Sequence, residues 1–379
     1  MKRLALIAGC LLSVSVSQAT YSGFTYQRTV VIDHTKVSTG ALTITNFPIE
    51  ISSMNIVMST SASGGHMTGA YDQIWSTKSD CSLSLYFDTE TVNNTGTSTT
   101  TVWVNVPSVS SVTDTTLYWC YGNSGITTYQ GVSSATWDSN YMGVWHMGTP
   151  TAFSAADSTG KNTGTPYSVS AAGGQISGAG SFDGTNSYVD VGVGSIVPYQ
   201  GSTMEAWVYA TGSLTSERII LDQYGGNHGY NFELNYADLP GEIGGVYQQD
   251  ASHYIEQFSE PGISGSVWEF AAEVYSATGI QTYFNGAATT LTAQYGPDNM
   301  SGNYSPGGIS KQIGGRFGSS SARWNGMIDE LRLSSIQRSS DWIKTEYNNQ
   351  SSPYTFTTIG AETTSGGAVT GNAFWFGEF

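Results

Sequence analysis

The chain carries little charge, and most of that charge is negative. Only 11% of its 379 residues are charged, and 29 acidic residues against 13 basic ones give a formal net charge of −16 at pH 7. So few basic residues exclude charge-driven binding to nucleic acid or to an anionic membrane surface. The acidity suits solubility outside the cell and the binding of cations.

Long apolar runs are absent after the N-terminus. No internal stretch is apolar over the roughly 20 residues that a membrane-spanning helix needs, so we expect no membrane span. Residues 1–19 form a different pattern: Lys2 and Arg3 precede a mostly apolar segment that ends at Ser17-Gln18-Ala19. This pattern predicts a signal peptide and therefore a secreted or cell-surface bacterial protein. Its removal would leave 11 basic residues against 29 acidic ones, a net charge of −18.

Cysteine is scarce. Of the three cysteines, Cys10 lies in the predicted signal peptide, where a lipoprotein signal with acylated Cys10 is the alternative interpretation. Cys81 and Cys120 remain, an even number in an oxidising compartment. We expect a disulfide between them that closes a loop of about 40 residues. Two buried free thiols are the alternative.

The motifs of several enzyme classes are also absent. The sequence contains no HExxH, nucleophile elbow, P-loop or CxxC motif. The five histidines are scattered along the chain: His34, His66, His146, His228 and His253. These absences favour a non-catalytic protein.

The residues that are abundant predict an all-β protein. The chain has 46 Gly and 23 Tyr, and its Thr, Val and aromatic runs are short and separated by polar turns. Such runs favour short strands over helices. Near the N-terminus we expect strands at residues 25–32, 99–106 and 115–121, within a small β-sandwich domain at residues 20–132.

Four motifs give this first domain a family resemblance. The segments T-Y-Q-R-T-V-V-I, Y-D-Q-I-W-S-T, V-W-V-N-V-P and L-Y-W-C-Y-G-N resemble a small bacterial secreted domain of unknown function, over residues 21–125. That domain often precedes a LamG-like domain, and Cys81 and Cys120 are paired departures from its pattern. A connector at residues 133–142 follows, and its aromatic residues predict that the two domains touch.

Residues 143–362 carry a second resemblance. The anchors are V-W-H-M, A-D-S-T-G-K-N-T-G, G-A-G-S-F-D-G-T, T-M-E-A-W-V-Y, W-E-F-A-A-E-V-Y and the closing I-D-E-L-R-L segment. In order and spacing they resemble LamG-like domains of the concanavalin A-like lectin/glucanase superfamily. The resemblance implies a jelly-roll sandwich of two antiparallel sheets. The chain is therefore expected to have two β-sandwich domains, the C-terminal one a concanavalin A-like jelly roll.

The closing segment is predicted in more detail. The period of two places Met327, Asp329, Leu331 and Leu333 on one strand face, and Ile328, Glu330 and Arg332 on the other. Ser339 or Ser340 can then cap a helix with Asp341 in its first turn. Residues 354–359 are expected to be extended.

Calcium is the cofactor that the resemblance implies. In the family, the opening Asp loop and the closing I-D-E strand lie close together, and related sandwiches often hold a structural calcium there. Carboxylate, amide and carbonyl oxygens are the ligands that calcium prefers. The expected ligands are Asp157, Asn162 and Asp329. The alternative is that Asp157 caps its own turn and Asp329 binds backbone amides.

A glycan site is predicted in the middle of the second domain. Sugars are held by aromatic faces together with planar amide and carboxylate groups. Two loop regions are rich in such groups, and the candidate ligand-binding residues are Tyr224, Asn227, His228, Tyr230, Tyr247, Gln248 and His253. The glucanases of the superfamily place E-x-D-x-E or E-x-D-x-x-E on one strand, and this chain has neither motif.

The most favoured function is therefore a secreted or cell-surface carbohydrate-binding or adhesion protein without catalysis. Its partner would be a glycan or a cell-surface polysaccharide. One alternative is a polysaccharide-degrading lyase or glycosidase. Another is a structural subunit of a pilus or other surface assembly, with surface-assembly proteins as partners. The Gly-rich tail at residues 363–379 ends in Phe374-Trp375-Phe376 and Phe379, which could dock to such a partner.

Overall fold

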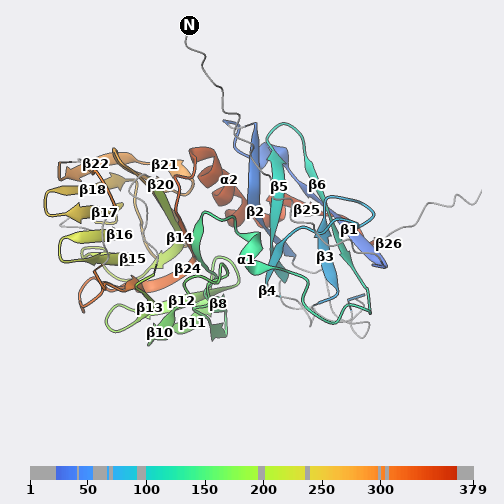
Figure 1. Cartoon of the computed structure of the whole chain (residues 1–379), viewed down its shortest axis with the longest axis horizontal. Helices are drawn as coiled ribbons and strands as arrows, with labels where there is room; N and C mark the ends of the chain where they lie inside the picture. The colour runs from blue at the N-terminus through green and yellow to red at the C-terminus, as the bar shows by residue number, and fades with distance from the viewer. Residues whose placement is uncertain are drawn as a thin grey trace, which may run out of the picture.

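The computed structural model describes residues 23–40, 42–53, 66–67, 71–91, 100–194, 201–234, 240–297, 300–303 and 307–364. The predicted signal peptide and the aromatic tail after residue 364 lie outside the described residues. Two β-sandwich domains lie next to each other, and helix α2 lies at their junction (Figure 1). The all-β prediction is confirmed, and every strand pairing among the described residues is antiparallel.

The N-terminal domain consists of two small sheets. One sheet has the order β25-β1-β6-β3, with β26 also paired to β1, and the other has the order β2-β5-β4. Their apolar faces form one core, in which Trp75 stacks on Trp119 with 5.0 Å between ring centroids. The elements are β1 (Tyr26–Ile32), η1 (His34–Lys36), β2 (Thr43–Ser53), β3 (Gln73–Ser76), β4 (Phe87–Thr91), β5 (Thr100–Ser110), β6 (Thr115–Tyr121) and α1 (Ser133–Thr136).

A disulfide links Cys81 to Cys120, as predicted. Cys120 lies in β6, and Cys81 lies after β3, its neighbour in the sheet. The Cα atoms are 6.2 Å apart, and both side chains are buried with Phe24 and Ile74. The bond therefore ties the irregular segment after β3 to the middle of the sheet.

The C-terminal domain is a sandwich of two larger sheets. The distal sheet, on the side away from the N-terminal domain, has the order β10-β13-β23-β15-β16-β17-β18-β22 (Figure 1). Its strands are β10 (Thr165–Tyr167), β13 (Tyr188–Gly192), β15 (Arg218–Gly225), β16 (His228–Leu234), β17 (Ile243–Asp250), β18 (His253–Glu260), β22 (Thr290–Tyr295) and β23 (Lys311–Ile313).

The proximal sheet faces the N-terminal domain and has the order β11-β12-β24-β14-β19-β20-β21, with β7 also paired to β24. Its strands are β7 (Tyr141–Trp145), β11 (Ser170–Gly173), β12 (Gly178–Asp183), β14 (Ser202–Ala210), β19 (Glu269–Ser276), β20 (Gly279–Phe284), β21 (Ala287–Ala288) and β24 (Asn325–Ser334). A small hairpin of β8 (Gly148–Thr149) and β9 (Ala152–Phe153) lies beside it.

Strand β14 shows how the proximal sheet is covered on both faces. Met204, Ala206 and Val208 point into the core between the two sheets. Trp207 points the other way and packs with Phe270 and with Ile343 of helix α2. Because alternate residues of a strand lie on opposite faces, this strand is covered on both sides and almost wholly buried.

Strand β24 departs from the expected alternation. Glu205 pairs with Arg332 and Trp207 with Asp329, so Glu330 and Leu331 together lie opposite the single residue Ala206. This β-bulge shifts the period by one, and Ile328, Leu331 and Leu333 all lie in the core. The predicted faces of residues 327–333 are therefore wrong after Asp329, because two residues occupy the place of one.

Helix α2 (Ser340–Ser351) joins the two domains. Ser339 caps it as predicted, since its side chain accepts a hydrogen bond from the Trp342 amide at 3.2 Å. Ile343 packs on the proximal sheet, whereas Trp342 meets Phe47 of the N-terminal domain edge-on at 4.7 Å. The expectation that the domains touch is confirmed. Among the described residues, no helix is long and apolar enough to cross a membrane.

The chain then returns to the first domain. After α3 (Pro353–Phe356), strands β25 (Thr357–Ile359) and β26 (Thr363–Thr364) both pair with β1. Residues 354–356 are thus helical, and only the end of the expected strand at 354–359 is extended. Strand β25 lies within residues 143–362, the range that we assigned to the second domain, yet it completes a sheet of the first domain.

Candidate functional site

The outer face of the distal sheet is polar because its strands alternate. Tyr230, Phe232 and Leu234 of β16 point into the core. The residues between them, Asn231 and Glu233, therefore lie on the outer face. Residues that pair across neighbouring strands lie on the same face of the sheet. Asp222 pairs with both Gln312 and Asn231, and Val246 pairs with Glu256, so these residues also lie on the outer face.

Three carboxylates on this face converge on Arg316. Its Nη2 atom lies 2.5 Å from Glu217 and 3.1 Å from Glu233, and its Nε atom lies 3.4 Å from Asp222. Burial raises the pKa of Asp222 to about 7, although the Arg316 charge acts in the opposite direction. Burial and the charge of Glu217 raise the pKa of Glu233 well above its ordinary value. The fully buried carboxyls hold the guanidinium group in place.

Arg316 in turn supports a tyrosine at the surface. Its guanidinium carbon lies 5.6 Å from the centroid of the Tyr224 ring, within the range of a cation–π interaction. The Tyr224 hydroxyl donates a hydrogen bond to Gln248 Oε1 at 2.6 Å, and Gln248 Nε2 donates to the Asp250 carbonyl at 3.0 Å. The ring and the amide are therefore fixed before any ligand arrives.

These two residues border a cavity of about 290 Å³, which we call the Tyr224 pocket. Asn227 enters it from the tight turn between β15 and β16, where Gly226 and Asn227 both have positive φ, as a type I′ turn requires. Glu256 contributes a carboxyl whose buried Oε1 has no hydrogen-bond partner among the described residues. The pocket is lined by Tyr224, Asn227, Gln248, Ala251, Tyr254 and Glu256.

The structure brings together three of the seven predicted ligand-binding residues, namely Tyr224, Asn227 and Gln248. Tyr230 and Tyr247 lie in the core, where Tyr247 stacks on Tyr275 at 3.9 Å, so a ligand cannot reach them. The sequence alone does not show which residues of β16 and β17 point inward, and we leave these two tyrosines out of the candidate site.

The two predicted histidines are not among the residues that line the pocket. His228 Nδ1 lies 2.9 Å from the Gly226 carbonyl oxygen, and His253 Nδ1 lies 2.8 Å from an Asp250 carboxylate oxygen. Three contributors, Tyr254, Glu256 and Arg316, are not among the seven predicted residues. Tyr254 and Glu256 are two residues apart on β18, and this spacing places them on the same face.

The predicted calcium ligands make other contacts. The Asp157 carboxylate accepts hydrogen bonds from the backbone amides of Val144, Thr159, Lys161 and Asn162, at 2.6–3.0 Å. The Asn162 side chain donates to the Met142 carbonyl at 2.6 Å. Asp329 Oδ2 accepts from the Ile176 amide at 2.9 Å. Asp157 therefore closes its own loop, which was the alternative interpretation, and the calcium site stays a prediction.

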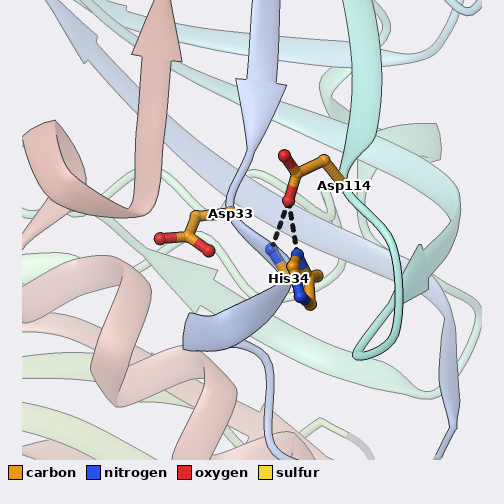
Figure 2. Close-up of side chains that lie close together, drawn as sticks. All are labelled: Asp33, His34 and Asp114. Carbon is orange, nitrogen blue, oxygen red and sulfur yellow. Dashed lines mark hydrogen bonds and ion pairs between the residues drawn. The ribbon is translucent and has the colours of Figure 1, made fainter.

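Two other groups of residues could hold a metal ion within the part of the chain that the structure describes. The first comprises Asp33, His34 and Asp114 in the N-terminal domain. Figure 2 shows Asp114 bonded to the ring and the backbone amide of His34, at 2.6 and 3.1 Å, and no such bond to Asp33. All three side chains are at least partly exposed. The second group, Glu90, His146 and Glu330, lies between the domains.

Comparison with known families assigns both domains. Residues 183–371 match the model of the concanavalin A-like lectin/glucanases superfamily. The C-terminal domain belongs to this superfamily. Residues 70–138 match a domain of unknown function (DUF2341), upstream of the concanavalin A-like domain as the resemblance implied. No curated protein matches the chain.

Solved structures are similar to about half of the chain. Domain 4 of AbnA, a GH43 extracellular arabinanase from Geobacillus stearothermophilus in complex with arabinotriose, aligns with 55% of this chain and 98% of its own, at 17% identity and a TM-score of 0.43. The binding domain of Paraclostridial Mosquitocidal Protein 1 gives 11% identity, coverage of 55% and 52%, and a TM-score of 0.43. The receptor binding domain of a botulinum neurotoxin C/D mosaic serotype gives 15% identity, coverage of 56% and 51%, and a TM-score of 0.41. This chain thus spans about half the length of these toxin domains.

Proposed function

We propose that this protein is a secreted or cell-surface carbohydrate-binding protein, and that its concanavalin A-like domain binds a glycan at the Tyr224 pocket without catalysis. The observation that carries the proposal is the set of groups on that pocket. Tyrosine rings, amides and one carboxyl are the groups that recognise sugars, through stacking on C–H faces and hydrogen bonds to hydroxyls.

Each group has a defined role in this proposal. Tyr224 is fixed by Arg316 and Gln248, so its ring offers a rigid face to a sugar. The Glu256 carboxyl, which lines the pocket, would accept a hydrogen bond from a sugar hydroxyl. At about 290 Å³ the pocket is at the small end of the usual range for ligand sites, about 300–1,000 Å³. It therefore suits a short segment of a longer sugar chain.

The positions of the carboxyls support a binding role over hydrolysis. Glycoside hydrolysis generally uses two carboxyl groups on either side of the scissile bond. Among the described residues, only one carboxyl, that of Glu256, lines the Tyr224 pocket. Asp222 and Glu233 are fully buried beside Arg316, so a polymer does not reach them.

A glycan array and a polysaccharide pull-down on residues 20–379 test this proposal. We expect binding that falls about fivefold in Tyr224→Ala, since stacking on an aromatic ring contributes about 1 kcal/mol. Gln248→Ala should also weaken binding. The matched control is Tyr167→Ala, which removes an exposed tyrosine from the edge strand β10 of the same sheet.

Binding that Tyr224→Ala and Gln248→Ala both retain at wild-type strength would refute the Tyr224 pocket, and release of products from a polymer would refute the non-catalytic role. No binding to any glycan would refute the proposal itself. Repeating the array with calcium and with EDTA tests the separate prediction that Asp157, Asn162 and Asp329 hold calcium.

A further inference from the structure

The bulge in β24 directs two carboxyls toward the N-terminal domain. Glu330 has a φ of +49°, a left-handed conformation that is strained for a residue with a side chain. The shift in register places Asp329 and Glu330 side by side on the sheet face that is turned away from the core. Strained residues and bulges of this kind occur often beside functional sites.

A histidine and a second glutamate meet Glu330 at this point. His146 directly follows β7, and Glu90 belongs to β4 of the other domain. His146 Nδ1 lies 2.6 Å from Glu330 Oε1 and 4.0 Å from Glu90 Oε2. The side chains of His146, Glu90 and Glu330 are only 11%, 4% and 0% exposed. We call these three residues the interdomain cluster.

The cluster has more carboxylate oxygens than donors. Glu90 Oε1 and Asp329 Oδ1 are buried and have no hydrogen-bond partner among the described residues. The same holds for Oε2 of the neighbouring Glu50. Arg332, the nearby arginine, is shared between Glu330 and Glu346. Buried carboxylates without donors are unfavourable unless a positive charge compensates them.

The surroundings orient the cluster in the way that metal ligands are oriented. On the far side of the ring, His146 Nε2 lies 3.4 Å from Asp88 Oδ2. Asp88 is fixed in turn by Ser133 Oγ at 2.6 Å and Trp137 Nε1 at 3.2 Å. A histidine that binds a metal through one ring nitrogen usually gives the other N–H to a carboxylate, as here.

The interdomain cluster also has a route to solvent. A cavity of about 940 Å³ lies between the domains, and Glu90 and Glu50 are part of its lining. Hydroxyl and amide side chains such as Thr91, Thr101 and Gln350 make up much of the rest. A hydrated cation can therefore reach Glu90 through a polar passage.

We propose that Glu90, His146 and Glu330 bind a divalent transition-metal ion of the zinc class, and that the ion links the two domains. One imidazole nitrogen with carboxylate oxygens is a donor set that zinc accepts. All three ligand atoms lie within 4.8 Å of one another. Metal–ligand bonds of about 2 Å would require His146 Nδ1 and Glu330 Oε1 to move apart to ~3 Å when the ion binds. Asp329 and Glu50 supply further oxygens nearby.

Zinc titration of the metal-stripped protein, residues 20–379, tests the proposal. We expect one tightly bound Zn²⁺ per chain by elemental analysis and a higher melting temperature with Zn²⁺. Glu90→Gln should weaken Zn²⁺ binding at least tenfold. This variant is a mild one, because Trp103 Nε1 is the only donor among the described residues that bonds to the Glu90 side chain. The control is Asp114→Asn, which alters the exposed group and should leave binding unchanged.

A second measurement does not depend on the folding of a ligand variant. The electron paramagnetic resonance spectrum of one equivalent of Cu²⁺ should show coupling to a single imidazole nitrogen, in the wild type and equally in His34→Gln. Absence of stoichiometric Zn²⁺ binding would refute the proposal. Binding that Asp114→Asn or His34→Gln abolishes, or that Glu90→Gln leaves unchanged, would refute it as well, and would place the ion elsewhere.

Discussion

The side-chain amide of Asn349 bonds to both backbone polar groups of Glu50. Asn349 Oδ1 accepts from the Glu50 N–H at 2.8 Å, and Asn349 Nδ2 donates to the Glu50 carbonyl at 2.9 Å. Glu50 belongs to β2, the edge strand of its sheet, so a helix of the second domain occupies the open edge of the first. The Asn349 side-chain amide thus makes the two backbone hydrogen bonds that a neighbouring strand would otherwise make with this edge.

Asn349→Ala should lower the free energy of unfolding by about 2–4 kcal/mol, because it leaves a buried N–H and a buried carbonyl without partners. Urea denaturation measures this loss. The matched control is Asn348→Ala, one residue away, where the half-buried side chain donates to the Lys36 carbonyl and makes no bond to Glu50 in the described part of the chain. Equal stability of the two variants would show that the Asn349 contact contributes little.

Removal of the disulfide by Cys81→Ala with Cys120→Ala should lower the free energy of unfolding by about 3–4 kcal/mol, the value for a loop closed over a sequence separation of 39 residues. The measurement is denaturation of both proteins with and without reductant. Reductant should destabilise the wild type and leave the double variant unchanged. A wild type that is indifferent to reductant would contradict the expectation.

Glu273→Gln should make stability less dependent on pH. Glu273 is buried, its Oε2 atom has no partner among the described residues, and burial raises the pKa of its carboxyl well above the ordinary value. A raised pKa means that the folded state holds a proton which the unfolded state releases. Stability therefore falls as pH rises from the unfolded pKa toward the folded one, by about 1.4 kcal/mol per pH unit.

Unfolding measured from pH 4 to pH 8 tests this. The wild type and Glu273→Gln should differ least near pH 4, and the variant should gain relative stability toward pH 8. Glu260→Gln, at an exposed position, is the control and should follow the wild type. Parallel curves for Glu273→Gln and the wild type would refute the prediction.

Arg316→Ala should destabilise the concanavalin A-like domain by about 3 kcal/mol near neutral pH, because it leaves Asp222 and Glu233 buried without their cation. The loss should shrink as the pH falls below about 7. The pKa of Asp222 is about 7 and that of Glu233 is raised by burial, so protons can then replace the missing charge. Chemical denaturation at two pH values measures the effect. A loss that does not depend on pH would argue against a charge mechanism.

Local signals in the sequence predicted much of the fold. The Thr- and Val-rich run at residues 115–121 is strand β6. Ser339 caps α2, and Cys81 and Cys120 form the expected disulfide. These features depend on a few neighbouring residues or on a simple count, so the sequence contains the information that decides them.

The features that the sequence did not reveal depend on distant partners. The extra residue in β24 becomes visible only against β14, and it moved Asp329 and Glu330 to one face. The inward direction of Tyr230 and Tyr247 depends on the register of β15 to β18. Arg316 joins the candidate site because the chain between β23 and β24 crosses the sheet. No local pattern specifies such contacts.

The pairing of β25 with β1 has a consequence for the order of folding. Residues 26–32 are synthesised first, but their partner at residues 357–359 comes more than 320 residues later. Until then β1 is an edge strand, and the first domain is an incomplete sheet that can associate with other chains. The N-terminal domain therefore cannot mature ahead of the rest of the chain. Its last step of assembly waits until nearly the whole concanavalin A-like domain has been made.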